Sequence, residues 1–597
     1  MMPTRLFDCL EYQLQHYPKN DMLAAKEDGS WRKYDTGEVK KMVTELAVGL
    51  LNLGISSGDG SVEGRDKIAV ISNNRPEWLL LDLAVQQTGA ILVPLYPTLA
   101  VAELEFILND ASVKLVFVSD ELLYTKVQSI RSLTPSVHAV YSFDHIQECL
   151  HWKDLLSPAT DSQTSRVQQI ADQVTYTDLA TIIYTSGTTG TPKGVMLSHQ
   201  NIISNILAAD IVFKEFCSNN DKALSFLPLN HIFERMISYV YIYNGVSIYY
   251  AENLDKIGDN LREVQPSVFS TVPRLLEKVY ERIMAKGQEL TGLKKKLFFW
   301  AVEVAGKFDL NKKTTLLYRL QLALANKLIF SKWRAGLGGR VKAVVTGAAA
   351  CQVRLLRIFT AGGIPIMEGY GLTETSPVIS VNGFDKQDRM FGTVGKVIKG
   401  VEVKIAADGE ICCRGENVMM GYYKRPDLTT EVIDPEGYFH TGDIGEFVNG
   451  KFLKITDRKK EIFKTSGGKY VAPQPIENKM KESKFIEQMM VVGAERKFAG
   501  ALIVPAFEYL QEWAKQNQIT FGTRFDLIRH PRVLELYKHV VEEMNTLFSH
   551  VEQSKKFELL PNEWTIDGGE LTPTLKLKRK VIMEKYKEAI ERIYENA

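Results

Sequence analysis

The chain has 597 residues, 45% of them apolar and 24% charged, which is typical of a globular protein with more than one domain. Lys and Arg (73) nearly balance Asp and Glu (72), so no overall field would attract nucleic acid or anionic lipid. The six cysteines show no CxxC spacing and favour a reduced chain without a metal site or disulfide framework.

The first segment, residues 1–21, lacks the apolar stretch of a signal peptide and predicts an amphipathic helix. The apolar run at 89–101 is too short for a membrane span and carries two prolines, so it predicts buried core. These features favour a cytoplasmic protein. Peripheral contact with a membrane is left open.

Strand-like and helical patterns alternate from residue 66 onward. Strands are predicted at 67–72, 89–95 and 114–119, with helices at 74–89 and 100–111 between them. This alternation predicts βαβ units and a parallel sheet.

A further buried strand, 180–186, runs into the stretch YTSGTTGTPKG at 184–194. The stretch is not a Walker A motif, because Lys193 is preceded by proline and followed by glycine. Its glycines, hydroxyls and lysine have the chemistry of a phosphate-binding loop, although the same residues also make solvated turns. Ser198 is the predicted N-cap of the next helix.

The rest of the chain shows two kinds of secondary-structure pattern. Strand–helix units are predicted at 266–283 and 341–350, with a helical block at 293–334 between them. After about residue 390, short strands with Gly and Asp turns predict a small β-barrel. The fold class is therefore α/β: a large N-terminal part (1–456) of βαβ-type sheets plus the barrel, then a small α+β C-terminal domain (457–597).

Four later motifs follow the loop in order: GYGLTETSP (369–377), YFHTGDIG (438–445), ITDRKKEIFKTSGGKYVAP (455–473) and GELTPTLKLKR (569–579). Together they resemble the adenylate-forming enzymes, which include acyl-CoA synthetases, firefly luciferase and peptide-synthetase adenylation domains. The resemblance covers nearly the whole chain and is greatest to long-chain fatty-acid–CoA ligases.

The resemblance implies an AMP-forming acid–thiol ligase. ATP and a medium- to long-chain fatty acid would give acyl-AMP and pyrophosphate, and coenzyme A would then give acyl-CoA and AMP. Mg²⁺ is the implied metal, and the enzyme would be a monomer or homodimer. Two alternatives stay open: a fatty acyl-AMP ligase that loads a carrier protein, and a catalytically silent scaffold.

The motifs assign expected roles around the nucleotide. Thr185 and Glu374 would hold Mg²⁺, a hard ion that prefers oxygen ligands. Tyr370 would pack beside adenine, Thr373 would contact the AMP phosphate, and Asp443 with Arg458 would bind the ribose. The triphosphate cradle would comprise Thr185, Ser186, Gly187, Thr188, Thr189, Gly190 and Lys193. The adenine and acyl sites would be lined by segment 346–350, which includes Gly347 and Ala348, and Gly371 is also expected to bind ATP.

Lysines near the C-terminus have two expected roles. Lys576 would neutralise charge as the carboxylate meets the α-phosphate, although Leu575 replaces a glycine common in related enzymes. Lys464 and Lys460 would reach the nucleotide in a second orientation of the C-terminal domain, with Asp457 as the hinge. A basic surface for a membrane or nucleic acid is the alternative for the cluster around Lys576.

The remaining expectations concern the acid and CoA. Gly467 and Gly468 would let pantetheine approach the backbone. His231, in LPLNHIFER, would lie near the acyl carboxylate without acting as a general base, whereas a core histidine is the alternative. Arg235 stands where some related enzymes have a tryptophan gate, and the tyrosine-rich segment 239–250 favours core over gate.

Overall fold

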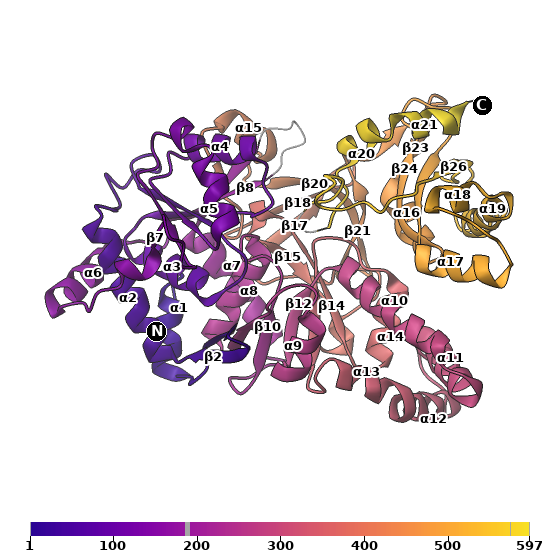
Figure 1. The fold of residues 1–597 in the computed structure, drawn as a ribbon, viewed down its shortest axis with the longest axis horizontal. Helices are drawn as coiled ribbons and strands as arrows, with labels where there is room; N and C mark the ends of the chain where they lie inside the picture. The colour runs from indigo at the N-terminus through magenta and orange to yellow at the C-terminus, as the bar shows by residue number, and fades with distance from the viewer. Residues whose placement is uncertain (1, 186–191, 573–574, 596–597) are drawn as a thin grey trace.

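The computed structural model describes residues 2–185, 192–572 and 575–595. It confirms the α/β class, with two large sheets and a small sheet followed by an α+β C-terminal part (Figure 1). Figure 1 shows the C-terminal part, in orange and yellow, beside the N-terminal part. Within these ranges no helix combines the length and apolarity needed to cross a membrane.

The first large sheet contains the predicted βαβ units. β3, β4 and β5 pair in parallel, and β8 joins β4 in the same direction. The chain then reverses into the antiparallel β9, so the phosphate-loop motif connects two strands of one hairpin. The order is β19 (Gly421–Tyr422), β9 (Lys193–Ser198), β8 (Leu179–Thr185), β4 (Ile91–Leu95), β3 (Lys67–Ile71), β5 (Leu115–Val118), β6 (Ala139–Ser142) and β7 (Leu150–His151).

The second large sheet is parallel through its centre, from β11 to β14. Antiparallel strands close its two edges. The order is β16 (Lys396–Val397), β15 (Val378–Val381), β14 (Ile366–Gly371), β13 (Ala343–Thr346), β12 (Val268–Thr271), β10 (Lys222–Ser225), β11 (Ser247–Tyr250), β1 (Leu23–Glu27) and β2 (Ser30–Tyr34).

Helices α3 (Pro76–Gln87) and α8 (Ile232–Tyr243) are buried on nearly every side. α3 contacts β4 of the first sheet and β1 of the second, which explains why it is buried on every side. Arg235 of α8 donates to Asp82 of α3 at 2.9 and 2.6 Å, and both side chains are fully buried. This charge pair fixes α8 against α3.

The other helices of the N-terminal part cover the sheets and their edges. Ser198 caps α7 as predicted, because its hydroxyl accepts from the Asn201 N–H at 3.1 Å. The helices are α1 (Asp8–His16), α2 (Thr36–Asn52), α4 (Val101–Asp110), α5 (Glu121–Gln128), α6 (Asp161–Gln173), α7 (His199–Phe213), α9 (Ile257–Val264), α10 (Pro273–Glu289), α11 (Gly292–Gly306), α12 (Leu316–Ala325), α13 (Ser331–Gly336), α14 (Val353–Ala361) and α15 (Pro426–Val432).

The predicted barrel is a four-stranded antiparallel sheet. Its last strand also bonds to the second large sheet's edge, because Val394 N–H donates to Leu453 C=O at 2.8 Å. The order is β17 (Val401–Ile405), β18 (Glu410–Gly415), β20 (Phe439–Val448) and β21 (Phe452–Arg458).

The C-terminal part has its own core, which begins at Val471. The predicted boundary at 456 and 457 falls inside β21, and it stays a prediction. The elements are β22 (Phe463–Lys464), β23 (Tyr470–Val471), β24 (Ile486–Val492), β25 (Gly500–Pro505), β26 (Lys556–Leu559), α16 (Pro473–Met480), α17 (Phe507–Gln516), α18 (Arg524–Arg529), α19 (Pro531–Asn545), α20 (Arg579–Lys585) and α21 (Lys587–Tyr594).

Two arginines of the N-terminal part hold the C-terminal part in place. Arg274 of α10 forms an ion pair with Glu487 of β24. Arg354 of α14 donates to the Glu482 carbonyl at 2.8 Å. These contacts fix the orientation in which the candidate site is assembled.

Candidate functional site

The site begins at one edge of the second large sheet. The carboxyl ends of β10, β13 and β14 meet there, and His231, Gly347 and Tyr370 lie at or just after these ends. Ligands of open α/β sheets bind at such edges. The edge therefore gathers three predicted site residues that are distant in sequence.

Asp443 is the centre of the best-defined polar group at this edge. Tyr370 Oη donates to Asp443 Oδ2 at 2.7 Å, and Arg458 Nε lies 3.2 Å from Asp443 Oδ1. Asp443 and Arg458 are direct cross-strand partners on β20 and β21. Burial raises the pKa of Asp443, and the Arg458 charge and the Tyr370 hydrogen bond only partly offset it. The ionised carboxylate of Asp443 therefore lowers the stability of the folded protein, as residues of binding sites often do.

Lys576 is brought to this group by the C-terminal part. Burial lowers its pKa to about 8, and the charge of Arg458 acts in the same direction. The carboxylates of Asp443, Glu461 and Glu374 act in the opposite direction. Residues more than a hundred positions apart are thus close enough to influence one another's charge.

A short antiparallel bridge between Leu571 and Leu577 positions Lys576. Thr572 N–H donates to the Lys576 carbonyl at 2.8 Å, and Lys576 N–H donates to the Thr572 hydroxyl at 3.0 Å. Leu575 has φ +61°, in the left-handed region that favours glycine. This conformation gives the physical reason why a glycine suits the position, and the leucine accepts it while packing against the C-terminal core.

His231 is the N-cap of α8, and its Nδ1 accepts from the Phe233 N–H at 3.1 Å. The preceding loop is anchored because Trp78 Nε1 donates to Asn230 Oδ1 at 2.9 Å. Burial lowers the pKa of His231 to about 4, and the Lys576 ammonium adds to the shift. The imidazole is therefore neutral at physiological pH and only a weak base, and its role at the acyl carboxylate stays a prediction.

Glu374 and Lys193 meet at a tyrosine that the sequence analysis did not identify. Tyr422 of β19 donates to Glu374 Oε1 at 2.9 Å. Lys193 Nζ lies 5.2 Å from the centre of the same ring. Thr185 is the direct cross-strand partner of Lys193 on β8 and β9. Both oxygen-bearing residues predicted for Mg²⁺ are thus near the hairpin that carries the loop motif.

The other nucleotide-site predictions concern Ala348, Gly371, Thr373 and five residues of the cradle. Ala348 follows β13 in a left-handed conformation, with φ +71°. A side chain at Gly371 would collide with the Pro377 carbonyl, since a Cβ would lie 1.6 Å from its oxygen. Thr373 is buried at the start of a short 3₁₀ turn. Five predicted cradle residues lie outside the described residues: Ser186, Gly187, Thr188, Thr189 and Gly190.

The second set of predicted lysines is not part of this assembly. Lys464 Nζ lies 5.6 Å from the Tyr470 ring centre, and its carbonyl accepts from Glu495 N–H. Lys460 is exposed, as are Gly467 and Gly468 in the turn beyond Lys464. Lys464 and its neighbours thus contact the C-terminal part itself, while Lys576 lies within the influence of the charges of Arg458 and Asp443. Their roles stay predictions.

Asp457 is buried at the junction of the two parts. Its Oδ1 accepts from the Arg458 N–H at 2.5 Å, whereas Oδ2 has no partner among the described residues. Burial raises the pKa of Asp457 to about 7, and the charges of Glu461 and Glu477 act in the same direction. Arg579 opposes them while it is itself paired with both glutamates.

Asp457→Asn is therefore expected to stabilise the protein at pH 8. Because the folded pKa exceeds the unfolded one, the folded state prefers the protonated acid, and the penalty grows as the pH rises from the ordinary pKa of 3.8 to about 7 and is complete above it. A shift of this size corresponds to at most about 4 kcal/mol. Unfolding midpoints of the variant and the unchanged protein should differ most above pH 7 and converge toward pH 4. Asp434→Asn is the control, since backbone hydrogen bonds lower the pKa of Asp434 and reverse the sign.

Two further expectations concern the acyl site. Arg235 is fully buried in its pair with Asp82 and also donates to the Thr181 hydroxyl at 2.8 Å, so it is a core residue and not a gate. The tyrosines of segment 239–250 are also core, as predicted. Tyr422 was missed because only a tertiary contact brings it to Glu374 and no local motif marks it. Glu461 lies within the motif at 455–473, but no role was assigned to it.

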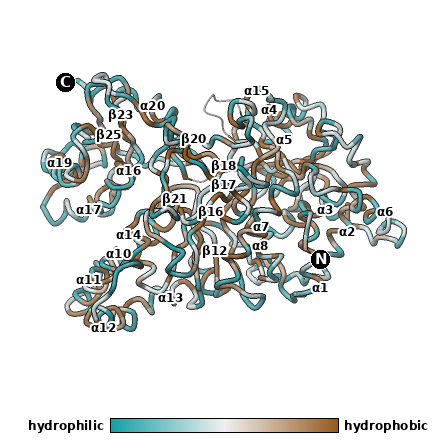
Figure 2. The backbone as a smooth tube through the Cα atoms, turned by 180° about the vertical axis from the view of Figure 1, so that it is seen from behind, coloured by the Kyte–Doolittle hydropathy of each residue, from teal (hydrophilic) through white to brown (hydrophobic). Residues whose placement is uncertain are grey.

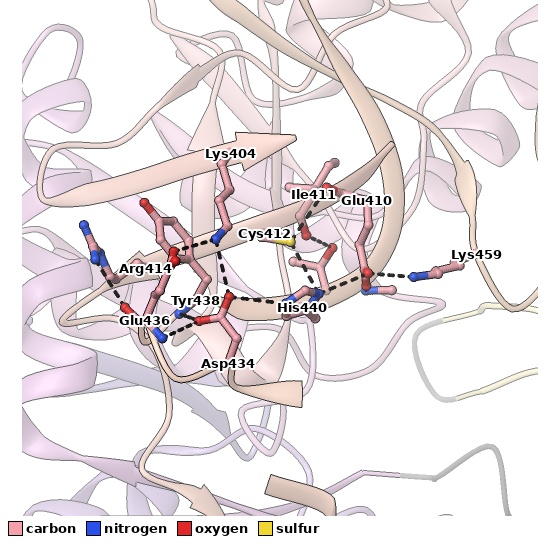
Figure 3. Close-up of polar contacts among 12 residues, drawn as sticks. Lys404, Glu410, Ile411, Cys412, Arg414, Asp434, Glu436, Tyr438, His440 and Lys459 are labelled. Atoms are coloured by element: carbon pink, nitrogen blue, oxygen red, sulfur yellow. Dashed lines mark hydrogen bonds and ion pairs between the residues drawn. The ribbon is translucent and has the colours of Figure 1, made fainter. Parts of the chain in front are cut away.

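Figure 3 shows a separate cluster of metal-ligand residue types on the small sheet. His440 Nδ1 lies 3.5 Å from Cys412 Sγ and 3.2 Å from Glu410 Oε2, while its Nε2 lies 3.5 Å from Asp434. The ammonium of Lys459, however, already lies 2.8 Å from Glu410 Oε2. Burial also raises the pKa of the Cys412 thiol to about 11. We therefore interpret the cluster as a charge network that joins β18, β20 and β21.

Two family profiles match the chain. The profile of AMP-binding enzymes matches residues 10–423, and that of the AMP-binding enzyme C-terminal domain matches residues 460–597. The chain is 34% identical to the long-chain-fatty-acid–CoA ligase FadD15 of Mycobacterium bovis, covering 95% of this chain and 93% of that protein. It is 35% identical to the peroxisomal long chain acyl-CoA synthetase 6 of Arabidopsis thaliana, covering 95% and 82%.

Solved structures agree at the level of the fold. The anthranilate CoA ligase AuaEII, crystallised with anthranoyl-AMP, superposes with a TM-score of 0.75 at 17% identity. The match covers 99% of each chain.

Proposed function

The chain belongs to the family of AMP-binding enzymes, and we propose that it is an ATP-dependent long-chain fatty-acid–CoA ligase. Relatives named for this activity match it along nearly its whole length. The observation that carries the mechanism is the meeting of Lys576 with Asp443, Arg458 and His231 at one sheet edge.

In the first half-reaction, a carboxylate oxygen of the fatty acid would attack the α-phosphorus of ATP. A new P–O bond forms, the bond to the bridging oxygen breaks, and pyrophosphate leaves with its electron pair. Lys576 would neutralise the negative charges that meet in this step, which is mainly a problem of positioning and electrostatics. Asp443 would accept hydrogen bonds from the ribose hydroxyls with support from Arg458, and Tyr370 would lie beside adenine.

In the second half-reaction, the CoA thiolate would attack the acyl carbon and AMP would leave. The C-terminal part would rotate near Asp457 and bring Lys464, Lys460 and the glycines 467 and 468 to the nucleotide. Lys464 lies apart from the group around Asp443, which supports assigning Lys576 and Lys464 to different half-reactions. The rotation would break the Arg274–Glu487 and Arg354–Glu482 contacts.

Mg²⁺ fits the oxygen donors near the loop hairpin. Glu374 has one carboxylate oxygen bonded to Tyr422, which leaves Oε2 for a cation, and Thr185 adds a hydroxyl. Bound Mg²⁺ would neutralise phosphate charge.

Glu374→Gln is expected to raise the Mg²⁺ concentration for half-maximal pyrophosphate release by about tenfold, because an amide oxygen is a weaker ligand than a carboxylate. Tyr422→Phe is the matched control, since it removes the hydrogen bond to Glu374 and keeps the carboxylate. An unshifted Mg²⁺ titration of Glu374→Gln would remove this residue from the metal site.

The acid is proposed to be of medium to long chain. Each methylene that leaves water contributes about 0.8 kcal/mol, so a long tail can dominate binding in an apolar site. We further propose a cytoplasmic enzyme that acts as a monomer or homodimer and binds no nucleic acid.

Pyrophosphate release tests the function. It is measured with ATP and Mg²⁺ across acetate, benzoate, octanoate, palmitate and the amino acids, with and without CoA. Turnover that is greatest with palmitate and depends on CoA supports the ligase. A burst with fatty acid that CoA does not turn over would instead favour an acyl-AMP ligase for a carrier protein. If no acid gives pyrophosphate release, a catalytically silent scaffold protein would be favoured.

A further inference from the structure

Helix α12 exposes a row of leucines to solvent. Leu316, Leu317, Leu320, Leu324 and Leu328 are 74, 67, 60, 47 and 39% exposed, and we call these five residues the leucine face. Their spacing places them on one side of α12 and the turn that follows it. Figure 1 shows this helix on the lower right rim of the molecule, and Figure 2 shows the same rim from behind.

The leucine face is not the result of a loosely attached helix. Tyr318, on the opposite side of α12, donates to the Val304 carbonyl of α11 at 3.0 Å. Asn326 donates to the Ala361 carbonyl at the end of α14 at 3.0 Å. The inner side of α12 is thus fixed, while its outer side is also apolar. Apolar side chains gathered on one exposed face of a protein usually mark an interaction surface.

Charge around the leucine face is strongly positive. Residues 292–334 contain ten Lys and Arg against two acids, although the whole chain has a net charge of only +1. Both acids are paired, Glu303 with Lys307 at 2.6 Å and Asp309 with Arg357 at 3.4 Å. In the described ranges, no carboxylate lies within 4.0 Å of the ammonium groups of Lys312, Lys313 or Lys327. The local excess of positive charge is therefore not neutralised.

We propose that the leucine face and its basic surroundings dock on an anionic lipid bilayer, with α12 lying in the plane of the interface. Leucines would enter the acyl boundary while Lys312, Lys313 and Lys327 contact lipid phosphates. A second copy of the chain is disfavoured, because pairing two such faces would bring two positive surfaces together. The docking requires neither ATP nor fatty acid, so it goes beyond the proposed activity.

Flotation with vesicles tests this docking on the full-length protein without substrates. Wild-type protein is expected to float with vesicles of phosphatidylcholine and phosphatidylglycerol and to bind pure phosphatidylcholine at least tenfold more weakly. Leu320→Glu with Leu324→Glu should lower binding to the anionic vesicles by about 30-fold or more, because charged groups are costly at membrane depth. Lys312→Gln with Lys313→Gln and Lys327→Gln should lower it by about tenfold and remove most of its salt dependence.

Leu122→Glu is the matched control, since Leu122 is 78% exposed on α5, at the opposite side of the molecule in Figure 1. This variant should float like wild type. Pyrophosphate release with octanoate, which needs no membrane, should be equal in all variants and shows that they fold. Equal flotation of Leu122→Glu and the double leucine variant would overturn the proposal. So would a wild-type dimer that does not float and that the leucine variant converts to a monomer.

Discussion

Replacing Lys576 by alanine is expected to slow acyl-AMP formation by about 10³-fold, the usual effect of removing one preorganised charge from a reacting centre. In the described orientation its ammonium is influenced by the charges of Arg458, Asp443 and Glu461, the group that we propose binds the nucleotide. Thioester formation from supplied acyl-AMP and CoA should change less than about threefold, because that step is proposed to use the other orientation. The two rates are measured separately, as pyrophosphate release and as acyl-CoA formation.

Lys464→Ala is the matched control, because it removes a lysine from the same C-terminal part. It should slow thioester formation and leave acyl-AMP formation nearly unchanged. If Lys576→Ala slows both half-reactions equally, the model with two orientations is wrong.

The pH dependence of Lys576 gives a second readout of the same prediction. Burial lowers its pKa to about 8 in the free enzyme, so the positive charge is present below pH 8 and is lost above it. The value of kcat/KM for ATP reports groups of the free enzyme and should fall as the pH rises through about 8. In Lys576→Arg, this fall should disappear, because a guanidinium stays charged.

Much of the fold follows from local pattern. The helix–strand alternation between Lys67 and Val118 places β3, α3, β4, α4 and β5 because apolar runs and their Gly or Pro boundaries are local signals. The glycines and the proline between β8 and β9 mark a turn in the sequence, but they do not show that the chain reverses there into an antiparallel strand. Strand β19 has only two residues, and no periodicity can indicate a strand of that length.

The site is predictable only in part, because contacts between segments that are distant in sequence leave no local pattern. Motifs identify Asp443 and Lys576 as residue types with a role, but their meeting depends on how the C-terminal part is oriented by Arg274 and Arg354. The partnership of Tyr422 with Glu374 is purely tertiary. The charge excess at α12 was visible in the sequence, but its exposed leucines were not, since an apolar helix is usually a core helix.

Asp443→Ala is expected to raise the KM for ATP by at least about 150-fold, because it removes two charge-assisted hydrogen bonds to the ribose that are worth about 1.5–3 kcal/mol each. The present partners of Asp443 are Tyr370 Oη at 2.7 Å and Arg458 Nε at 3.2 Å, and each oxygen can accept more than one bond. A ribose diol could therefore be bound without the loss of either contact. The effect on kcat should be smaller, since the ribose does not react.

The unfolding midpoint distinguishes a role of Asp443 in ribose binding from a role in joining β20 to β21. Burial raises the pKa of Asp443, so at neutral pH the folded protein holds the ionised carboxylate at a cost that alanine removes. Arg458 is 41% exposed and can be hydrated when its partner is lost. The unfolding midpoint of Asp443→Ala without ATP should therefore equal or exceed that of the unchanged protein, whereas the midpoint shift that ATP produces should largely disappear. A lower midpoint together with an unchanged KM would show that Asp443 joins β20 to β21 and does not bind the nucleotide.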